Sequence, residues 1–315
     1  MMARGTIVEV TTTARLHLGF FDLGDGPGRR FGSLGLALDG PRTRLTIGFA
    51  DHTIVDGEEC ERARRYLATL VAAHGLSRQH ALTIQEAIPP HAGLGSGTQL
   101  ALAIGAGLRA LHGLPADPRQ DAAWLGRGAR SGIGIALFAA GGVAVDGGRG
   151  DRAQPPPLLA RLPVPADWRV ILVLDRGRAG LSGAGEVAAF AALPAMAEPV
   201  SAALCRLALM AALPGLAEDD IAAFGAAITR MQEILGDHFA PAQGARFISP
   251  AVAAALARLA AAGAVGIGQS SWGPSGFAFA RGDAAAAALA AEAAAPGLEI
   301  HVCRARNEAA AVSIT

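Results

Sequence analysis

The sequence predicts an α+β fold made of two domains. With 315 residues, the chain is long enough for two domains of common size with substantial buried cores. Strand-like alternation and helix-like spacing of apolar residues both occur in each half of the chain. Glycine-rich segments at residues 89–98 and 263–276 connect these elements, and helix, glycine-rich turn, strand and helix in succession are typical of an α+β arrangement.

In the first half, periodicity predicts both strands and helices. Alternating or glycine-bounded apolar runs predict strands at residues 6–10, 13–23, 34–47, 81–85 and 141–148. Apolar residues spaced by three or four positions predict helices at residues 58–74 and 99–111. The arginines of the first helix are assigned to its solvated face: Arg62, Arg64 and Arg65. In the second helix, Gly105 and Gly107 predict close packing against another backbone, because each otherwise costs about 1 kcal/mol of helix stability.

The second half begins after a proline-rich passage at residues 154–165. This passage is predicted to lie on the surface and to approach a domain boundary, which gives domains at residues 1–165 and 166–315. An apolar run then predicts a buried strand at residues 168–175. The elements predicted beyond it are helices over residues 186–235 and 249–262, a strand at 277–279 and a last strand at 298–303.

The composition excludes several classes of protein. Basic and acidic residues number 27 each, so neither a nucleic acid nor a membrane surface is expected as a partner. All basic residues are arginine, which excludes Schiff-base chemistry on a lysine. Cys60, Cys205 and Cys303 are too few and too widely spaced for a disulfide framework or a zinc site. The first ten residues lack the apolar run of a signal peptide, so a cytoplasmic protein is expected.

Residues 88–98 form the most informative stretch, because a glycine-rich loop leads directly into a helix. Two prolines end the preceding strand, and three alternating glycines allow positive φ and close backbone approach: Gly93, Gly95 and Gly97. Ser96 or Thr98 is expected to cap the helix. A helix N-terminus presents unpaired N–H groups and the positive end of the helix dipole. The loop therefore predicts a phosphate or diphosphate site.

Further arginines and hydroxyl groups occur in glycine-rich segments elsewhere. Arg29 lies beside Arg30 in a turn that fits a solvated hairpin tip and a substrate-gripping loop equally well. Residues 126–135 contain two arginines and a serine that can approach a bound anion: Arg127, Arg130 and Ser131. Arg176 and Arg178 follow the predicted strand at residues 168–175. A late cluster contains Ser270, Ser271 and Trp272, of which the tryptophan is favoured as a core residue over an aromatic wall.

The loop at residues 89–98 resembles the phosphate loop of the GHMP kinase superfamily, with Gly97 in place of the usual second serine. The segments at residues 14–19 and 266–276 match the same superfamily in the same order. This resemblance implies a ribosomal protein S5-like N-terminal domain, a ferredoxin-like C-terminal domain and a ligand between them. Residues of the kinases are missing, because Gly134 replaces the catalytic aspartate and Ala123 replaces an acidic metal ligand, with only Asp121 nearby.

These departures resemble one subfamily, the β-ribofuranosylaminobenzene 5'-phosphate synthases of methanopterin biosynthesis. The motifs that carry this resemblance lie at residues 14–22, 28–33, 126–134, 141–148 and 268–274. It implies that phosphoribosyl diphosphate condenses with 4-aminobenzoate or 4-hydroxybenzoate, with loss of carbon dioxide and diphosphate, in tetrahydromethanopterin-dependent one-carbon metabolism. No hydroxyl is deprotonated in this reaction, which accounts for the absent aspartate. An ATP-dependent small-molecule kinase and a non-catalytic protein that binds a phosphosugar or nucleotide are the alternatives.

The resemblance also implies roles for the candidate residues. Diphosphate with Mg²⁺ is assigned to residues 93–98, where Ser96 and Thr98 are the expected metal or phosphate contacts, assisted by Arg127, Arg130 and Ser131. His17, Asp22 and Arg15 are the catalytic candidates. The 5'-phosphate or the aryl carboxylate is left open among four arginines: Arg15, Arg29, Arg176 and Arg178. Ser270, Ser271 and Trp272 are expected to complete the substrate pocket, and the protein is expected to be a homodimer.

Overall fold

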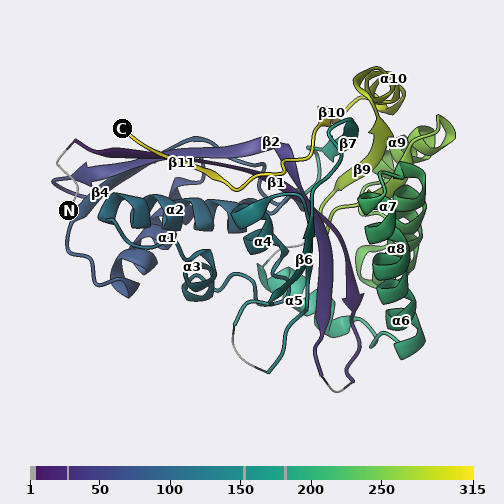
Figure 1. Ribbon diagram of the computed structural model, residues 1–315, viewed down its shortest axis with the longest axis horizontal. Helices are drawn as coiled ribbons and strands as arrows, with labels where there is room; N and C mark the ends of the chain where they lie inside the picture. The colour runs from purple at the N-terminus through teal and green to yellow at the C-terminus, as the bar shows by residue number, and fades with distance from the viewer. Residues whose placement is uncertain (1–4, 27, 152–153, 181–182) are drawn as a thin grey trace.

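The structure, a computed structural model, describes residues 5–26, 28–151, 154–180 and 183–315. Within these residues, the chain forms a seven-stranded sheet and a four-stranded sheet that meet along a shared core. Helices of the first half cover one face of the seven-stranded sheet (Figure 1). The predicted α+β arrangement is therefore confirmed.

The first sheet is built around a long antiparallel pair, β1 (Ile7–Asp22) and β2 (Phe31–Ala50). Its strand order is β11-β1-β2-β4-β3. In addition, β5 pairs with residues 33–36 of β2, and β6 pairs with β5. The remaining strands are β3 (Ile54–Gly57), β4 (Gln79–Glu86), β5 (Val143–Asp146), β6 (Leu158–Leu162) and β11 (Ala311–Ile314). The helices of this half are α1 (Cys60–Ala73), α2 (Ser96–His112), α3 (Pro118–Trp124) and α4 (Ile133–Ala140).

The second sheet has the strand order β10-β7-β9-β8, in which every neighbouring pair is antiparallel. In chain order this is the fourth, first, third and second strand, which is the ferredoxin-like order that the sequence resemblance implies. The strands are β7 (Trp168–Asp175), β8 (Val265–Gln269), β9 (Ser275–Arg281) and β10 (Leu298–Cys303). The helices are α5 (Gly183–Ala192), α6 (Glu198–Leu207), α7 (Leu213–Ala217), α8 (Ile221–Gln243), α9 (Pro250–Ala261) and α10 (Asp283–Ala293).

Residues 198–217 form an apolar helical segment made of α6, a π-helical turn (Ala208–Ala212) and α7. The segment is long and apolar enough to cross a membrane by length and composition alone. Here, however, Leu204, Ala208 and Leu216 are buried in the core shared with β1 and α8. One side of this segment therefore packs as a core helix of the second half.

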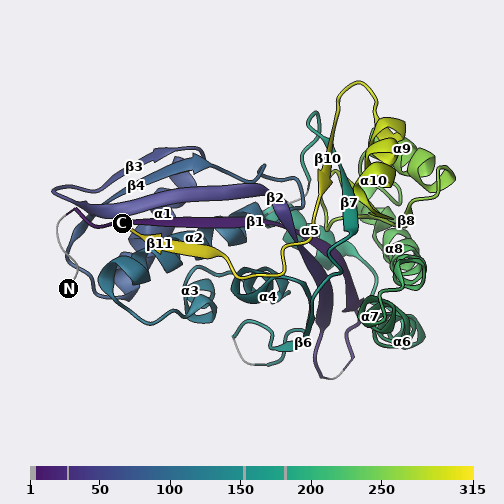
Figure 2. The same ribbon diagram turned by 45° about the horizontal axis from the view of Figure 1, so that its top comes forward.

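Two predictions about chain organisation were wrong, the first of them only in part. The surface prediction for residues 154–165 holds for exposed residues such as Leu159 and fails for Pro155 and Pro156, which are buried and whose carbonyl oxygens accept hydrogen bonds from Arg119. The strand at residues 298–303 is not the last one, because β11 follows it and pairs with β1. Figure 2 shows β11 returning alongside β1 to the end of the molecule where the chain begins.

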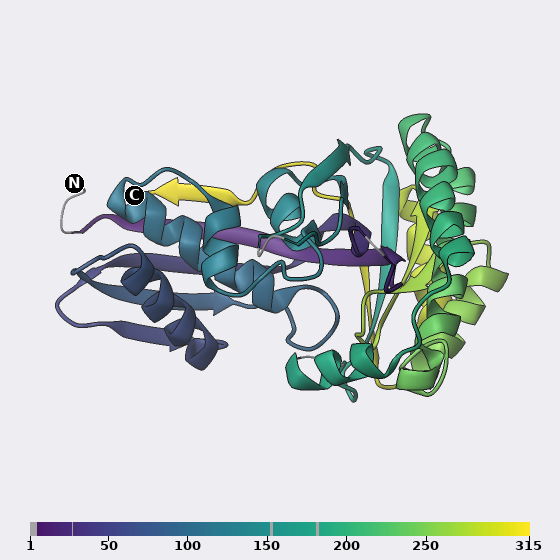
Figure 3. The ribbon, with the colours of Figure 1, turned by 90° about the horizontal axis from the view of Figure 1, so that it is seen from below.

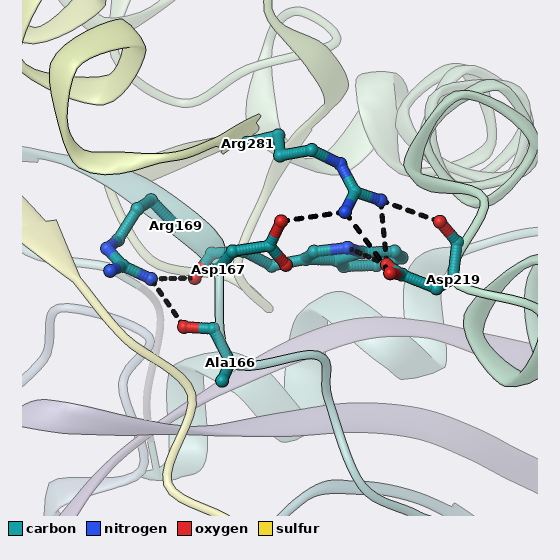
Figure 4. A network of polar contacts seen from close by, with 6 residues as sticks. Ala166, Asp167, Arg169, Asp219 and Arg281 are labelled. Atoms are coloured by element: carbon teal, nitrogen blue, oxygen red, sulfur yellow. Dashed lines mark hydrogen bonds and ion pairs between the residues drawn. The ribbon is translucent and has the colours of Figure 1, made fainter.

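The two halves share one core, and polar contacts join elements within the second half. Leu16 and Leu18 of β1 share a hydrophobic cluster with Leu172 of β7 and Met231 of α8. At the end of β9, the Arg281 guanidinium donates to Asp167 Oδ2 and Asp219 Oδ1, both at 2.7 Å (Figure 4). Trp168 Nε1 donates to the same Asp219 carboxylate at 2.7 Å, so the turn before α8 is tied to the start of β7.

Candidate active site

The glycine-rich loop has the geometry of an anion site at the start of α2. Gly95 is the N-cap of this helix with φ +82°, and Gly93 has φ +76°. A Cβ at residue 93 would lie 2.1 Å from the Ser270 carbonyl oxygen, so only glycine fits there. The expectation that Ser96 or Thr98 caps the helix was wrong, because Gly95 occupies the cap position without a side-chain hydrogen bond. Both hydroxyl-bearing residues instead line the cleft.

Two arginines flank this loop. Arg15 Nη1 donates to the Gly93 carbonyl at 2.5 Å, and the Arg15 guanidinium carbon lies 3.2 Å from the position that a Cβ of residue 95 would take. On the other side, the Arg127 guanidinium carbon lies 3.6 Å from the corresponding position at Gly97 and stacks 5.2 Å from the centre of the Tyr66 ring. The loop therefore presents helix N–H groups between two guanidinium groups, which suits a polyanion.

A cleft of about 420 Å³ opens above the loop, a volume typical of small-molecule sites. Many of the predicted site residues line it: Arg15, His17, Gly93, Gly95, Ser96, Gly97, Thr98, Arg127, Arg130, Ser131, Ser271 and Trp272. Several residues without a predicted role in the site line the same cleft: Phe20, Arg62, His91 and Glu186. Segments from both halves of the chain thus meet at this cleft, and Figure 3 shows α5 between the helices of the first half and those of the second.

The arginine-containing segment at residues 126–132 is held by a buried carboxylate. Asp146, only 1% exposed, accepts hydrogen bonds from Ser33 Oγ (2.5 Å), Ser131 Oγ (3.1 Å) and the backbone N–H groups of Gly132 and Gly148 (both 2.8 Å). Burial raises the pKa of Asp146, while these four hydrogen bonds oppose the shift. The carboxylate therefore fixes the start of α4 to β2 and β5, next to the segment that carries both cleft arginines.

His17 is a neutral side chain inside a cationic cleft. It is 5% exposed, and its Nε2 has no hydrogen-bond partner among the described residues. Burial first, and then the charges of Arg15 and Arg130, lower the pKa of His17 to about 3. Burial also lowers the pKa of Arg15 to about 10, against the attraction of Glu186, so Arg15 remains a cation at neutral pH. His17 can thus donate or accept a hydrogen bond there without carrying charge.

Aromatic side chains form one wall of the cleft. Phe20 and Trp272 line it, and Phe190 of α5 packs edge-on against both, with ring centres at 5.8 and 5.2 Å. Trp272 is 3% exposed, and its Nε1 is buried without a partner among the described residues. The residue is therefore part of the core and part of the cleft wall.

Five predicted site residues lie outside the cleft. Asp22, at the end of β1, accepts hydrogen bonds from Gly24 N and Ser201 Oγ. The other four make structural contacts: Arg29 with the carbonyls of Gly147 and Gly148, Arg176 with Glu299, Arg178 with Asp175 and Ile248, and Ser270 with Gly93 O and His17 N. In this structure these side chains contact other protein groups, and Ser270 clamps the loop to β1, while their assignment to ligand contacts stays a prediction.

Arg62 illustrates why sequence alone missed part of the site. Its spacing in α1 is that of a solvated arginine, so it was predicted to lie on the solvated face of the helix. This prediction was wrong, because Arg62 lines the cleft and pairs with Glu59 at 3.0 Å. Glu186 likewise has no local sequence signal. It pairs with Arg130 at 2.7 Å, and burial raises the pKa of its carboxyl against the opposing pull of the cleft arginines.

The positions at which kinase residues are missing have a structural explanation. A Cβ at Gly134 would lie 2.8 Å from Thr98 Cγ2, so the Thr98 methyl group occupies the space that a side chain would need. Asp121, the nearest acidic residue to the expected metal ligand, is 1% exposed and binds Arg109 at 2.9 Å, packed against Gly105. Neither position offers a carboxylate to the cleft.

Comparisons with known proteins first define the class of fold. The family description GHMP kinases N terminal domain matches residues 61–142, and GHMP kinases C terminal matches residues 212–297. Among solved structures, the homoserine kinase of Cytophaga hutchinsonii is similar with a TM-score of 0.72 at 17% identity, covering 99% of each chain. The fold is that of the GHMP kinases.

Sequence relatives define the family more closely. β-Ribofuranosylphenol 5'-phosphate synthase of Archaeoglobus fulgidus is 36% identical over 241 residues, covering 72% of this chain and 76% of the relative. The synthase of the same name from Methanothermobacter thermautotrophicus is 31% identical over 291 residues, covering 84% and 86%. The chain belongs to the β-ribofuranosylphenol 5'-phosphate synthase family within the GHMP kinase superfamily, and it is an enzyme.

Proposed function

We propose that this enzyme joins phosphoribosyl diphosphate to 4-hydroxybenzoate or 4-aminobenzoate and releases carbon dioxide and diphosphate. The observation that carries the proposal is a cleft lined by a helix N-terminus and four arginines, in a chain where Gly134 stands in place of the kinase carboxylate. The names of the two archaeal relatives support the same class of product. In this proposal, the enzyme works in the cytoplasm as a homodimer in tetrahydromethanopterin biosynthesis.

The anionic groups of the sugar substrate divide between two sides of the cleft in this proposal. The diphosphate binds the loop at residues 93–98 between Arg15 and Arg127, where the N–H groups of α2 point toward it. Arg62 and Arg130 are the remaining cleft arginines available to the 5'-phosphate and the aryl carboxylate. The aryl ring lies against Phe20 and Trp272, the aromatic wall of the cleft.

The chemical step fits side chains that bind and orient rather than deprotonate. The bond between the anomeric carbon and diphosphate breaks, and both electrons leave with the diphosphate oxygen. The ring carbon that bears the carboxylate then attacks the anomeric carbon, and loss of carbon dioxide returns an electron pair to the ring. Atoms and charge balance without a proton from solvent, so a neutral His17 suits a role in orienting the aryl substituent. The arginines stabilise the charge on the leaving diphosphate.

Mg²⁺ is the proposed cofactor. Within the described part of the chain, no three His, Cys, Asp or Glu residues form a cluster that could hold a metal. The hydroxyl groups at the start of α2 fit a cation that is shared with the substrate, since Mg²⁺ is commonly held by substrate phosphates and few protein groups. Ser96 and Thr98, with their hydroxyl groups at the start of α2, would contact it. When bound, the ion neutralises charge on the diphosphate.

A labelled-substrate assay tests the proposed function. The purified protein is incubated with phosphoribosyl diphosphate, Mg²⁺ and carboxyl-labelled 4-hydroxybenzoate or 4-aminobenzoate, and released carbon dioxide and diphosphate are measured. We expect release that requires both substrates. Arg127→Ala should raise KM for phosphoribosyl diphosphate roughly 10- to 100-fold, because a charge-assisted contact is lost. The control is Arg230→Ala, since Arg230 is an exposed arginine of α8 paired with Glu233.

The kinase alternative has a distinct outcome in the same assay. It is favoured by the similarity to homoserine kinase, a similarity that extends over the whole chain. ATP-dependent phosphorylation of a small alcohol, without release of labelled carbon dioxide, would establish the kinase and reject the synthase. Binding of phosphosugar or nucleotide without either reaction would instead indicate a protein that retained the cleft and lost catalysis.

A further inference from the structure

Among the described residues, Glu186 is the acidic residue that lines the cleft, and its position is fixed by the fold. It lies in the first turn of α5, one helical turn before Phe190. Phe190 anchors this helix in the aromatic cluster, with ring centres 5.2 Å from Trp272, 5.9 Å from Phe239 and 6.0 Å from Phe31. Because residues four apart share a helix face, the anchoring of Phe190 directs Glu186 toward the cleft.

The charge of Glu186 works against binding of an anion. The other charged groups that line the cleft are four arginines: Arg15, Arg62, Arg127 and Arg130. Glu186 pairs with Arg130 at 2.7 Å, and its side chain is only 23% exposed. A carboxylate in such a cleft repels phosphate groups and neutralises part of the arginine charge. A cleft built only for binding polyanions gains nothing from this residue.

A cation does form in this cleft if the proposed function is correct. When the diphosphate leaves, positive charge develops on the anomeric carbon and the ring oxygen of the sugar. The arginines stabilise the departing anion, but they repel this developing cation. A fixed carboxylate in a partly buried cleft stabilises such charge far better than water does, because it needs no reorganisation during the step.

We propose that Glu186 stabilises the positive charge on the anomeric carbon while the diphosphate leaves. The proposal rests on the proposed function and assigns its acidic electrostatic partner. The ion pair with Arg130 opposes the rise in the pKa of this carboxyl that burial causes, and it holds the side chain in the cleft until substrate binds. Glu186 makes no covalent bond and transfers no proton in this role.

Three variants test the role of Glu186. Glu186→Gln removes the charge and keeps the shape, Glu186→Asp keeps the charge, and Glu233→Gln removes a matched carboxylate from an exposed arginine pair on α8. For each, diphosphate affinity is measured by calorimetry, and kcat and KM are measured with saturating aryl acid over a range of Mg²⁺ concentrations. Wild-type enzyme is assayed in parallel.

We expect kcat of Glu186→Gln to fall roughly 100-fold or more, the usual effect of removing one preorganised electrostatic group. Its diphosphate affinity should be equal to or higher than that of the wild type, because the arginines lose an opposing charge. Glu186→Asp should recover part of kcat, and Glu233→Gln should match the wild type. Retained diphosphate binding would also show that the Glu186→Gln cleft is folded.

Three results would overturn the assignment. An unchanged kcat in Glu186→Gln would exclude the electrostatic role. A kcat restored by excess Mg²⁺ would make Glu186 a metal ligand, and a large loss of diphosphate affinity would make it a positioning residue for Arg130. If the wild type itself releases neither carbon dioxide nor diphosphate, the proposed function fails together with this inference, and that result is separate from any effect of the variants.

Discussion

Each cleft arginine is held by a neighbour before any ligand binds. Arg62 and Arg130 pair with Glu59 and Glu186, Arg15 donates to the Gly93 carbonyl, and Arg127 stacks on Tyr66. Arg15 and Arg127, the two arginines beside the glycine-rich loop, are held by uncharged groups, which reduces the entropy lost when diphosphate binds. The arrangement therefore favours tight binding of diphosphate without any lysine.

At the residue scale, His17 should make stability depend on pH. Its pKa is about 3 in the folded protein and near 6.5 when unfolded, so the unfolded chain binds the extra proton between these values. The free energy of unfolding should therefore rise with pH across this window, by up to about 1.4 kcal/mol per pH unit from this group. Denaturant unfolding of the wild type and His17→Gln between pH 4 and 6.5 measures the difference in slope.

The His17→Gln comparison isolates one histidine from the others. His80, whose pKa burial lowers to about 4, is present in both proteins and cancels in the difference. A steeper pH dependence in the wild type supports a buried neutral His17. Parallel curves would show that His17 is protonated to the same extent in the folded and unfolded chains.

A second prediction at the residue scale concerns Gly134, where the effect of an alanine substitution on stability should change sign with the residue at position 98. Gly134→Ala should destabilise the protein by about 1–3 kcal/mol, because its Cβ would lie 2.8 Å from Thr98 Cγ2. In a Thr98→Ser background that methyl group is gone, so the same change should stabilise by up to about 1 kcal/mol through helix propensity. Equilibrium denaturation of the four proteins tests this, and the same sign in both backgrounds would contradict it.

At the element scale, a helix with a strong local pattern could be predicted from the sequence, whereas a strand that depends on pairing with a distant segment could not. The helix at 99–111 was predicted because its spacing is strongly periodic. Gly107 and Gly105 are closely packed, but against side chains such as Ile47 and Asp121, so the predicted approach to another backbone was wrong. In contrast, β11 is only four residues long, and its pairing with β1 bridges the whole chain. The glycine-rich loop and Arg127 were predicted from composition, whereas Glu186 was not, because its partner Arg130 lies in a separate loop.

The segment before α4 depends on Asp146, which leads to a prediction at the scale of an element. Asp146→Asn should destabilise the protein by about 1–3 kcal/mol, because its two oxygens each accept from a backbone N–H and an amide nitrogen cannot replace either. Diphosphate affinity should fall as well, since residues 126–132 carry Arg127 and Arg130. Denaturation and calorimetry measure both effects.

A control variant, Asp237→Asn, distinguishes the loss of the Asp146 hydrogen bonds from a general loss of negative charge. Asp237→Asn changes a 61% exposed side chain of α8 that pairs with Arg246, so it should leave stability and affinity nearly unchanged. If Asp146→Asn behaves like Asp237→Asn, then Asp146 does not organise the arginine segment.

At the scale of the whole molecule, the end of the chain joins the two sheets. After β10, the chain leaves the second sheet, forms a bridge between Ala305 and Leu38 of β2, and continues into β11 beside β1. Its last segment also covers the connection from β6 to β7. Asn307 Oδ1 accepts from Val164 N at 2.8 Å, and its Nδ2 donates to Val164 O at 2.9 Å. Asn307, near the C-terminal end of the sequence, thus holds the segment that connects the first sheet to the second.

Asn307→Ala should therefore lower the stability of the whole molecule and leave the cleft unchanged. Both Val164 backbone groups lose their partner in a part-buried position, which should cost about 1–3 kcal/mol of unfolding free energy. Asn307→Asp keeps an acceptor for the N–H but places an acceptor against the Val164 carbonyl, so it should be destabilised to a similar degree. Diphosphate affinity should stay at the wild-type value in both, because Asn307 is not among the residues that line the cleft. A parallel loss of affinity and stability would mean that the junction of the sheets also sets the geometry of the cleft.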